Sequence, residues 1–232
     1  GYSSSDFKNR LHGVIVTEFL KNRTLGDLLQ IERDGNEIPF WDDTMKLINI
    51  YGIASAILYL HSNNIIHCDL KPGNIYLDDF LFPRIGNFSH SKILINKGRN
   101  ESQQFNSDVI ESIEYMEPEI IVKGKSKTET DVYSFGIIVY QILTKKSPFI
   151  GTIHNQIMFN LDPDIKIHKA YEELIEQCCD IAPRKRPNIS EVVNRLKTNP
   201  EFITEKVDKE FFESYIEFID SQQQQHQQGN ET

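Results

Sequence analysis

Cysteine is scarce in this sequence, and its few thiols are poorly placed for cross-linking. Only Cys68, Cys178 and Cys179 occur among 232 residues. An odd number with two adjacent members does not form a disulfide framework, and no C-x-x-C pair gives the spacing of a zinc site. We therefore predict reduced thiols and an intracellular, cytoplasmic protein.

A surplus of basic residues and a long hydrophobic run are also missing. Lys and Arg number 25 against 34 Asp and Glu, which gives a formal net charge of −9. Because nucleic-acid-binding proteins present basic surfaces, we expect no nucleic-acid partner. No apolar stretch is long enough to cross a bilayer, so we expect no membrane segment. The chain begins with Gly1 and not with Met, as a fragment of a longer product would.

The remaining composition, with 39% hydrophobic residues, is ordinary for a soluble globular protein. The β-branched run at 13–20 predicts a buried strand, and residues 74–79 are also strand-like. Apolar spacing over 41–62 predicts a long helix that Asp42 or Asp43 caps. Residues 89–112 predict a long loop, and the glutamine-rich end is predicted to be disordered. Further helical segments are predicted at 24–29, 128–145, 152–160, 170–180, 189–197 and 211–220, which makes the fold class mainly α.

The motif "IIHCDLKPGNIYL" at residues 65–77 carries the strongest chemical signal. Phosphoryl transfer requires an oriented hydroxyl, neutralised phosphate charge and bound metal ions. Asp69 can accept a hydroxyl proton, and Lys71 can neutralise phosphate charge. Asn74 offers an amide oxygen, a ligand suited to Mg²⁺. A lone Asp–Lys pair is by default a surface salt bridge, but the full pattern H-x-D-L-K-x-x-N between a helix and a strand is far more specific.

Four further segments give the chain its resemblance to the eukaryotic protein kinase family. "GNFS" (86–89) stands where the family has the metal-binding Asp-Phe-Gly, and "YMEPE" (115–119) resembles its Ala-Pro-Glu motif. "DVYSFG" (131–136) and "RKRP" (184–187) match later landmarks. The resemblance implies a kinase-like C-terminal lobe with a remnant of the β-rich N-terminal lobe. It divides the chain into a remnant or linker (1–10), a kinase domain (11–197), a helical extension (198–220) and a disordered tail (221–232).

The resemblance also assigns a nucleotide site and a subgroup. Lys71 and the segment "IVTEFL" look most like the tyrosine-kinase-like group, whose members mostly phosphorylate Ser or Thr. By this likeness Thr17 is the gatekeeper, Glu18 and Leu20 belong to the hinge that binds adenine, and Tyr76 lies beneath the adenine ring. The implied cofactors are ATP and Mg²⁺, and the implied partner is a protein substrate or signalling protein.

Residues 1–10 lack three parts that the family uses to hold ATP. These parts are a Gly-rich loop, a strand Lys for the phosphates and a helix Glu that holds this Lys. They either precede Gly1 in a longer product or do not exist. We therefore expect this chain alone to be inactive, with ATP and Mg²⁺ binding weakened or absent if the N-terminal lobe is missing.

Two motif positions depart from the family pattern. Asn87 replaces the metal-binding Asp and offers Mg²⁺ a neutral oxygen in place of a charge, which could cost about 10²-fold in rate; the alternative is that Asn87 only caps a turn. Ser89 replaces the Gly that follows. Cys68 replaces the Arg that docks a phosphorylated activation loop, so loop phosphorylation should not switch the site in the usual manner.

Other residues in these motifs are predicted to have structural roles. We expect His67 to pack and bond the backbone near Phe88, and Asp131 to accept backbone N–H groups of the catalytic loop. Arg186 is expected to pair with Glu119 in the interior. Two functions remain open: a protein Ser/Thr kinase that uses Asp69, Lys71 and Asn74, with Asn74 and Asn87 at the metal, or a pseudokinase-like binding module without catalysis.

Overall fold

The computed structural model describes residues 2–3, 14–15, 18–21, 23–94, 115, 127–146, 149–153 and 156–229. Within these ranges the protein is built mainly of α-helices, which confirms the predicted fold class. The helices are α1 (Leu25–Arg33), α2 (Asp43–Ser62), α4 (Thr128–Thr144), α5 (Lys169–Cys178), α6 (Ile189–Thr198) and α7 (Lys209–Gly229). The strands pair antiparallel as β1 (Tyr2–Ser3) with β2 (Val14–Ile15), β3 (Ile65–Ile66) with β6 (Lys92–Ile93), β4 (Ile75–Leu77) with β5 (Pro83–Ile85), and β7 (Phe149–Ile153) with β8 (Gln156–Asn160).

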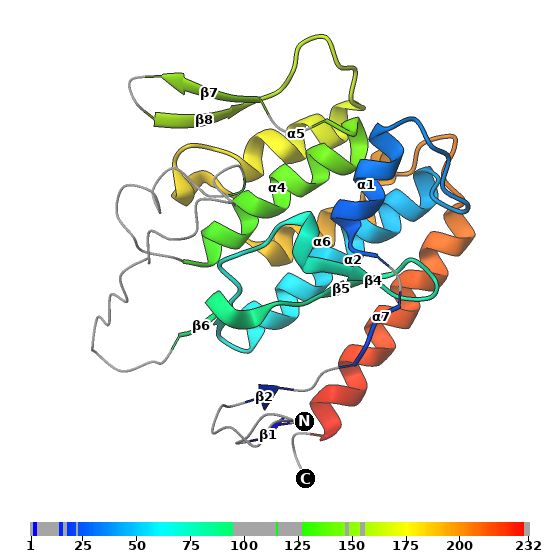
Figure 1. Ribbon diagram of the computed structural model, residues 1–232, viewed down its shortest axis with the longest axis vertical. Helices are drawn as coiled ribbons and strands as arrows, with labels where there is room; N and C mark the ends of the chain where they lie inside the picture. Colours follow the sequence, from blue (N-terminus) through cyan, green and yellow to red (C-terminus); the bar gives the residue numbers. More distant parts are fainter. Residues whose placement is uncertain are drawn as a thin grey trace.

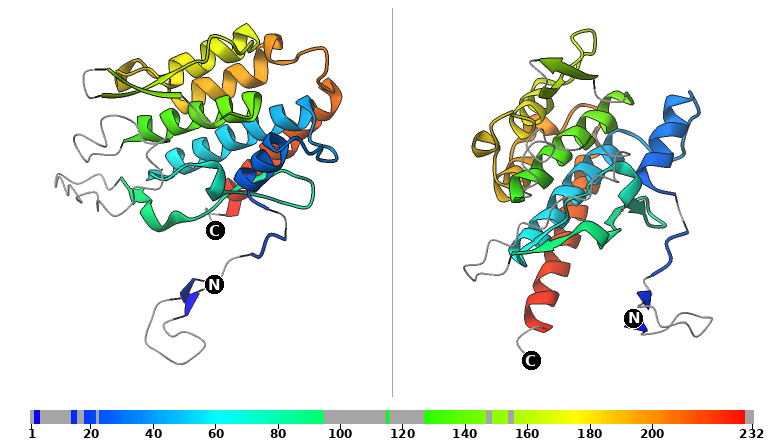
Figure 2. Two further views of the ribbon diagram at one scale, coloured as in Figure 1. Left: turned by 45° about the horizontal axis from the view of Figure 1, so that its top comes forward. Right: turned by 60° about the vertical axis from the view of Figure 1, so that its left-hand side comes forward.

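Helices α2 and α4 form the centre of the body and are buried on nearly all sides, as their apolar sequences predict. In Figure 2, α5 lies over α4 and α4 lies over α2, while α6 and α7 also pack against α2. The carboxylate of Asp42 accepts the backbone N–H of Met45 at 2.9 Å, so Asp42 and not Asp43 caps α2. In the sequence, α2 precedes the loop between β3 and β4 and α4 follows it. Both helices help to hold this loop in place.

Helix α7 runs beside α2 and the β4–β5 hairpin (Figure 1), and aromatic side chains make the contact. The centre of the Tyr51 ring lies 5.7 Å from that of Phe212 and 6.3 Å from that of Tyr215. Phe82, next to β5, lies 4.6 Å from Tyr215. This close approach requires Gly52, because a Cβ there would overlap the Tyr215 hydroxyl. The C-terminal helix is therefore fixed to the strand that precedes "GNFS".

Three predicted segments differ from the structure. The helix predicted over 152–160 is wrong: residues 149–153 and 156–160 form the β7–β8 hairpin, in keeping with their β-branched and aromatic content. Of the buried strand predicted at 13–20, Val14–Ile15 is a strand, whereas 18–20, the other residues described there, are not, and Phe19 is 83% exposed. Residues 221–229 continue α7 where disorder was predicted, because Gln is a good helix former and the helix is already anchored on α2.

An ion-pair junction at Glu32 links α1, α2 and the end of α4. The Glu32 carboxylate accepts hydrogen bonds from Lys46 Nζ at 2.8 Å and Trp41 Nε1 at 3.0 Å, and Lys145 Nζ lies at 3.1 Å. Burial alone would raise the pKa of Glu32, but the hydrogen bonds from Lys46 and Lys145 outweigh it and hold the pKa below its ordinary value of 4.5. The ionised carboxylate therefore stabilises the folded state.

Replacing Glu32 by Gln should lower the free energy of unfolding at pH 7 by about 1–3 kcal/mol, since charge-assisted hydrogen bonds are lost. The stability from Glu32 is fully present above pH 4.5 and is lost as the pH falls through the lowered folded-state pKa. Urea unfolding of the variant should therefore show a shallower loss of stability below pH 4.5. Glu37→Gln, at an exposed position, is the control; an unchanged acid slope in Glu32→Gln would contradict the prediction.

Candidate active site

The loop between β3 and β4 is held in place by one buried carboxylate. Asp131 of α4 accepts the backbone N–H groups of His67 and Cys68, each at 2.9 Å. Asp131 also bonds to the ring of His61, whose Nε2 lies 2.9 Å from Asp131 Oδ2. Asp131 is fully buried. The predicted role of Asp131 is confirmed, whereas His61 was missed because its partner lies 70 residues away along the chain.

His67 connects this loop to the "GNFS" segment. Its Nε2 lies 2.9 Å from the carbonyl oxygen of Gly86, and its Nδ1 accepts the backbone N–H of Asp69 at 3.3 Å. These two bonds together require the neutral ring with its proton on Nε2. The Phe88 ring packs edge-on at 5.1 Å. The predicted packing of His67 near Phe88 is confirmed. Both ring nitrogens of His67 bond to backbone groups.

Asp69, Lys71 and Asn74 come together in space. A 3₁₀ turn at Pro72–Asn74 brings Asn74 back to the start of the motif. There Asn74 Nδ2 donates to the carbonyl oxygen of Asp69 at 2.7 Å and to its Oδ2 at 2.8 Å. Lys71 Nζ lies 3.5 Å from Asp69 Oδ1. The result is a nearly buried carboxylate with one oxygen held by an amide and the other facing a cation.

Asn87 joins the same cluster from the end of the β4–β5 hairpin. It has left-handed backbone, with φ 60° and ψ 66°, and its side chain caps no backbone N–H group. Its Nδ2 donates to Asn74 Oδ1 at 3.0 Å, and its Oδ1 accepts the Ser89 hydroxyl at 2.8 Å. The turn-capping alternative therefore does not describe this side chain. In the sequence Ser89 is recognisable only as the residue in place of a Gly, and its bond to Asn87 was not predicted.

The donor set at Asn74 and Asn87 does not fit Mg²⁺ as it stands. Proteins usually bind Mg²⁺ through one or two carboxylates. Here two neutral amides meet, and one of them presents an N–H group and not an oxygen to the other. No cluster of three His, Cys, Asp or Glu side chains with metal-binding geometry occurs in the part of the chain that the structure describes. The structure thus brings the two predicted metal ligands together as hydrogen-bond donor and acceptor.

The predicted adenine site is only partly in view. Thr17 lies outside the described residues, Glu18 is exposed and Leu20 is half-buried. Tyr76 is half-buried on β4 and forms a β-bridge with Thr24, just before α1. The segment that follows the predicted hinge therefore lies beside the strand that carries Tyr76. The nucleotide roles of these residues stay predictions.

Arg186 is buried and has partners that the sequence did not indicate. Its Nη1 donates to the carbonyl oxygen of Glu129 at 3.0 Å, and its Nε donates to that of Asp180 at 2.9 Å. The guanidinium also lies 4.9 Å from the centre of the Tyr133 ring. Glu119, its predicted partner, lies outside the described residues. Because backbone carbonyl groups carry no sequence signal, the two observed partners could not be predicted.

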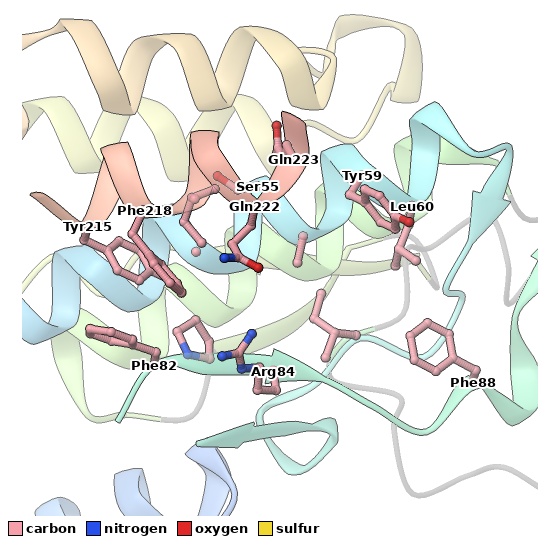
Figure 3. A pocket seen from close by; sticks show the side chains of 15 residues that line it. Ser55, Tyr59, Leu60, Phe82, Arg84, Phe88, Tyr215, Phe218, Gln222 and Gln223 are labelled. Atoms are coloured by element: carbon pink, nitrogen blue, oxygen red, sulfur yellow. The ribbon is translucent and has the colours of Figure 1, made fainter. Parts of the chain in front are cut away.

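Two cavities are lined in part by residues of the "IIHCDLKPGNIYL" and "GNFS" segments. One of about 230 Å³ lies beside Lys71, between α1 and α4, with Gly26, Gly73 and Tyr115 in its lining. The other, of about 340 Å³, lies between α2, β5 and α7 (Figure 3). Its lining includes the side chains of Tyr59, Phe82, Arg84, Phe88, Phe218 and Gln222. This second cavity shares Phe88 with the "GNFS" segment, but none of Asp69, Lys71, Asn74 and Asn87 lines it.

Two general properties complete the description. All three cysteines are free thiols, as predicted. Among the helices that the structure describes, none is both long and apolar enough to span a membrane.

Comparison with known proteins gives consistent matches. The sequence model of the family described as "Protein kinase domain" matches residues 4–196. The chain is 26% identical to Cysteine-rich receptor-like protein kinase 44 of Arabidopsis thaliana over 230 residues, which cover 88% of this chain and 60% of that protein.

Other relatives match over shorter parts. The chain is 35% identical over 137 residues to the Arabidopsis G-type lectin S-receptor-like serine/threonine-protein kinase SD1-1, with 58% of this chain and 16% of that protein covered. Cysteine-rich receptor-like protein kinase 6 of Oryza sativa subsp. japonica is 29% identical over 211 residues, with 80% of this chain and 30% of that protein covered. The chain thus spans three fifths or less of the length of these relatives.

Proposed function

Because the chain belongs to the protein kinase domain family, we propose that its protein transfers phosphate from ATP to Ser or Thr of a protein substrate, at a rate that Asn87 impairs. Kinase domains use ATP and Mg²⁺ in general. The Ser/Thr assignment is supported by the relatives, among them SD1-1, which is named a serine/threonine-protein kinase. The predicted cytoplasmic location is part of the same proposal and is supported by the free thiols.

The observation that carries the proposal is the state of the Asp69 carboxylate. Asn74 holds Oδ2 at 2.8 Å, so Asp69 cannot rotate freely, while Oδ1 remains on the side of Lys71. A substrate hydroxyl next to Oδ1 would give its proton to Asp69 as the oxygen attacks the phosphoryl group. The Lys71 ammonium is close enough to neutralise charge that develops there. The cavity beside Lys71 leaves space for a substrate side chain to approach.

Asn87→Asp in the full-length protein tests both parts of the proposal. We expect slow transfer to Ser or Thr by the natural sequence and transfer about 100-fold faster by the variant, because a carboxylate supplies the charge that the amide lacks. The measurement is phosphate incorporation from labelled ATP, followed by phosphoamino-acid analysis. Asn194→Asp makes the same charge change on the exposed surface of α6 and should leave the rate unchanged.

The second candidate function is a pseudokinase-like binding module, which the Asn87–Asn74 hydrogen bond favours. In that case the catalytic loop serves as structure, and a helical surface binds a signalling partner. The same assay separates the two functions. Absence of transfer by both the natural sequence and Asn87→Asp would reject the kinase proposal and leave the binding module. Tyrosine phosphorylation would contradict the proposed substrate class.

A further inference from the structure

We propose that a one-directional chain of hydrogen bonds through Asn87 takes the place of a divalent cation in this catalytic loop, so that the loop keeps its geometry without Mg²⁺. The inference concerns the cation requirement of the site to which the proposed function assigns catalysis, and it deepens that proposal. It rests on the directions of the hydrogen bonds within the cluster. A low rate of phosphate transfer alone would not indicate these directions.

The outer end of the chain of hydrogen bonds is the Ser89 hydroxyl. The Ser89 hydroxyl donates to Asn87 Oδ1 at 2.8 Å. With its oxygen engaged there, Asn87 turns its Nδ2 toward Asn74 and donates to Oδ1 at 3.0 Å. A hydroxyl can donate or accept, so the orientation of the Asn87 amide is assigned from its other side, where Asn74 presents an oxygen.

The inner end of the chain fixes Asn74 in the same way. Its Nδ2 donates to two oxygens of Asp69, the carbonyl at 2.7 Å and Oδ2 at 2.8 Å. Both are acceptors only, since an ionised carboxylate cannot donate. Asn74 must therefore face Asp69 with its nitrogen and Asn87 with its oxygen. Every donor points toward Asp69, where the chain ends.

Charge within the cluster is already balanced. Asp69 contributes one negative charge, and the Lys71 ammonium lies 3.5 Å from its Oδ1. The side chains of Asn74, Asn87 and Ser89 are neutral. The cluster thus has no excess negative charge that a cation would neutralise, in contrast to a site with two carboxylates.

Cation binding would have to break this arrangement. Asn87 would turn its amide over to present an oxygen, and so would lose its bond to Asn74, while its bond with the Ser89 hydroxyl would have to reverse direction. In return the cation would gain two neutral ligands and would lose water, which Mg²⁺ releases reluctantly. An aspartate at position 87 reverses the balance, since two oxygens about 3 Å apart with no proton between them attract a cation.

Manganese provides a direct probe, because this paramagnetic ion broadens the NMR signals of nearby nuclei. We would titrate the isotope-labelled 232-residue chain with Mn²⁺ alone and follow the side-chain amide signals of Asn74. For the natural sequence these signals should stay sharp. In Asn87→Asp they should broaden at Mn²⁺ concentrations roughly tenfold lower or less than any that affect the natural sequence.

Two further variants keep the test decisive. Asn194→Asp, with the same added charge far from the loop, should behave as the natural sequence does. Ser89→Ala frees the Asn87 oxygen and should admit Mn²⁺ more readily than the natural sequence, whether or not Asn87→Asp folds. Broadening in the natural sequence at the concentration that affects Asn87→Asp would overturn the inference. Sharp signals in both Asn87→Asp and Ser89→Ala would overturn it too, because the amide chain would then not be what excludes the cation.

The titration contains neither ATP nor substrate, so its outcome is separate from that of the transfer assay. Failure of phosphate transfer with the expected Mn²⁺ response would reject the proposed function and keep the inference. Transfer with Mn²⁺ broadening in the natural sequence would do the reverse.

Discussion

Replacing Asp69 by Ala in the full-length protein is expected to lower phosphate transfer about 10²–10⁴-fold, the usual contribution of a positioned general base. The carboxylate is the only group of the cluster placed to take a hydroxyl proton, within the part of the chain that the structure describes. Asn74 keeps one of its two bonds to residue 69 in this variant, because the backbone carbonyl oxygen, at 2.7 Å, remains. The loss would therefore report the missing carboxylate and not a collapsed loop. Initial rates at saturating ATP measure it.

Asp79→Ala is the matched control for this prediction. Asp79 is exposed at the turn that follows β4. Its removal should leave the rate within about twofold, since substitutions at exposed positions usually have small effects. A loss of less than tenfold in Asp69→Ala would remove Asp69 from the mechanism. Equal losses in both variants would indicate a general effect on folding.

Asp131→Ala is expected to destabilise the protein by about 3–5 kcal/mol, because two backbone N–H groups and a histidine ring lose their buried acceptor. The N–H groups of His67 and Cys68 both bond to this carboxylate at 2.9 Å. Chemical denaturation measures the change in unfolding free energy. Hydrogen exchange should show the amides of His67 and Cys68 among those that lose most protection, because their loop loses its anchor.

Glu176→Ala, on the exposed face of α5, is the control and should change stability by less than about 0.5 kcal/mol. If Asp131→Ala cost less than about 1 kcal/mol, the loop would have to be held by other contacts. In that case His61, 2.9 Å from the same carboxylate, would be the first group to examine.

The sequence predicted those parts of the site whose chemistry and spacing are both encoded locally. Asp69, Lys71 and Asn74 lie within six residues, and a short turn is enough to bring them together. The long helices followed from apolar spacing that is strong over many turns. Asp131 was predicted from the family motif, and the structure supplies the reason for it, namely two backbone N–H groups of a buried loop that bond to its carboxylate.

The parts that could not be predicted depend on direction or on distant partners. A sequence shows that Asn87 and Asn74 are amides, but not which of them donates; the oxygens of Asp69, which accept from Asn74, decide that in three dimensions. The β7–β8 segment is short and mixed in pattern, so helix and strand were poorly separated. Residues 221–229 continue a helix that Phe212 and Tyr215 anchor on α2, and the composition of a glutamine run does not show this continuity.

The aromatic contact between Phe82 and Tyr215 has a consequence for synthesis on the ribosome. The rings meet at 4.6 Å although 133 residues separate them along the chain, and the loop at His67 waits for Asp131, 64 residues later. At elongation rates of about 5–20 residues per second, Asp131 is synthesised several seconds after His67. The loop that carries Asp69 is thus translated before the carboxylate that anchors it.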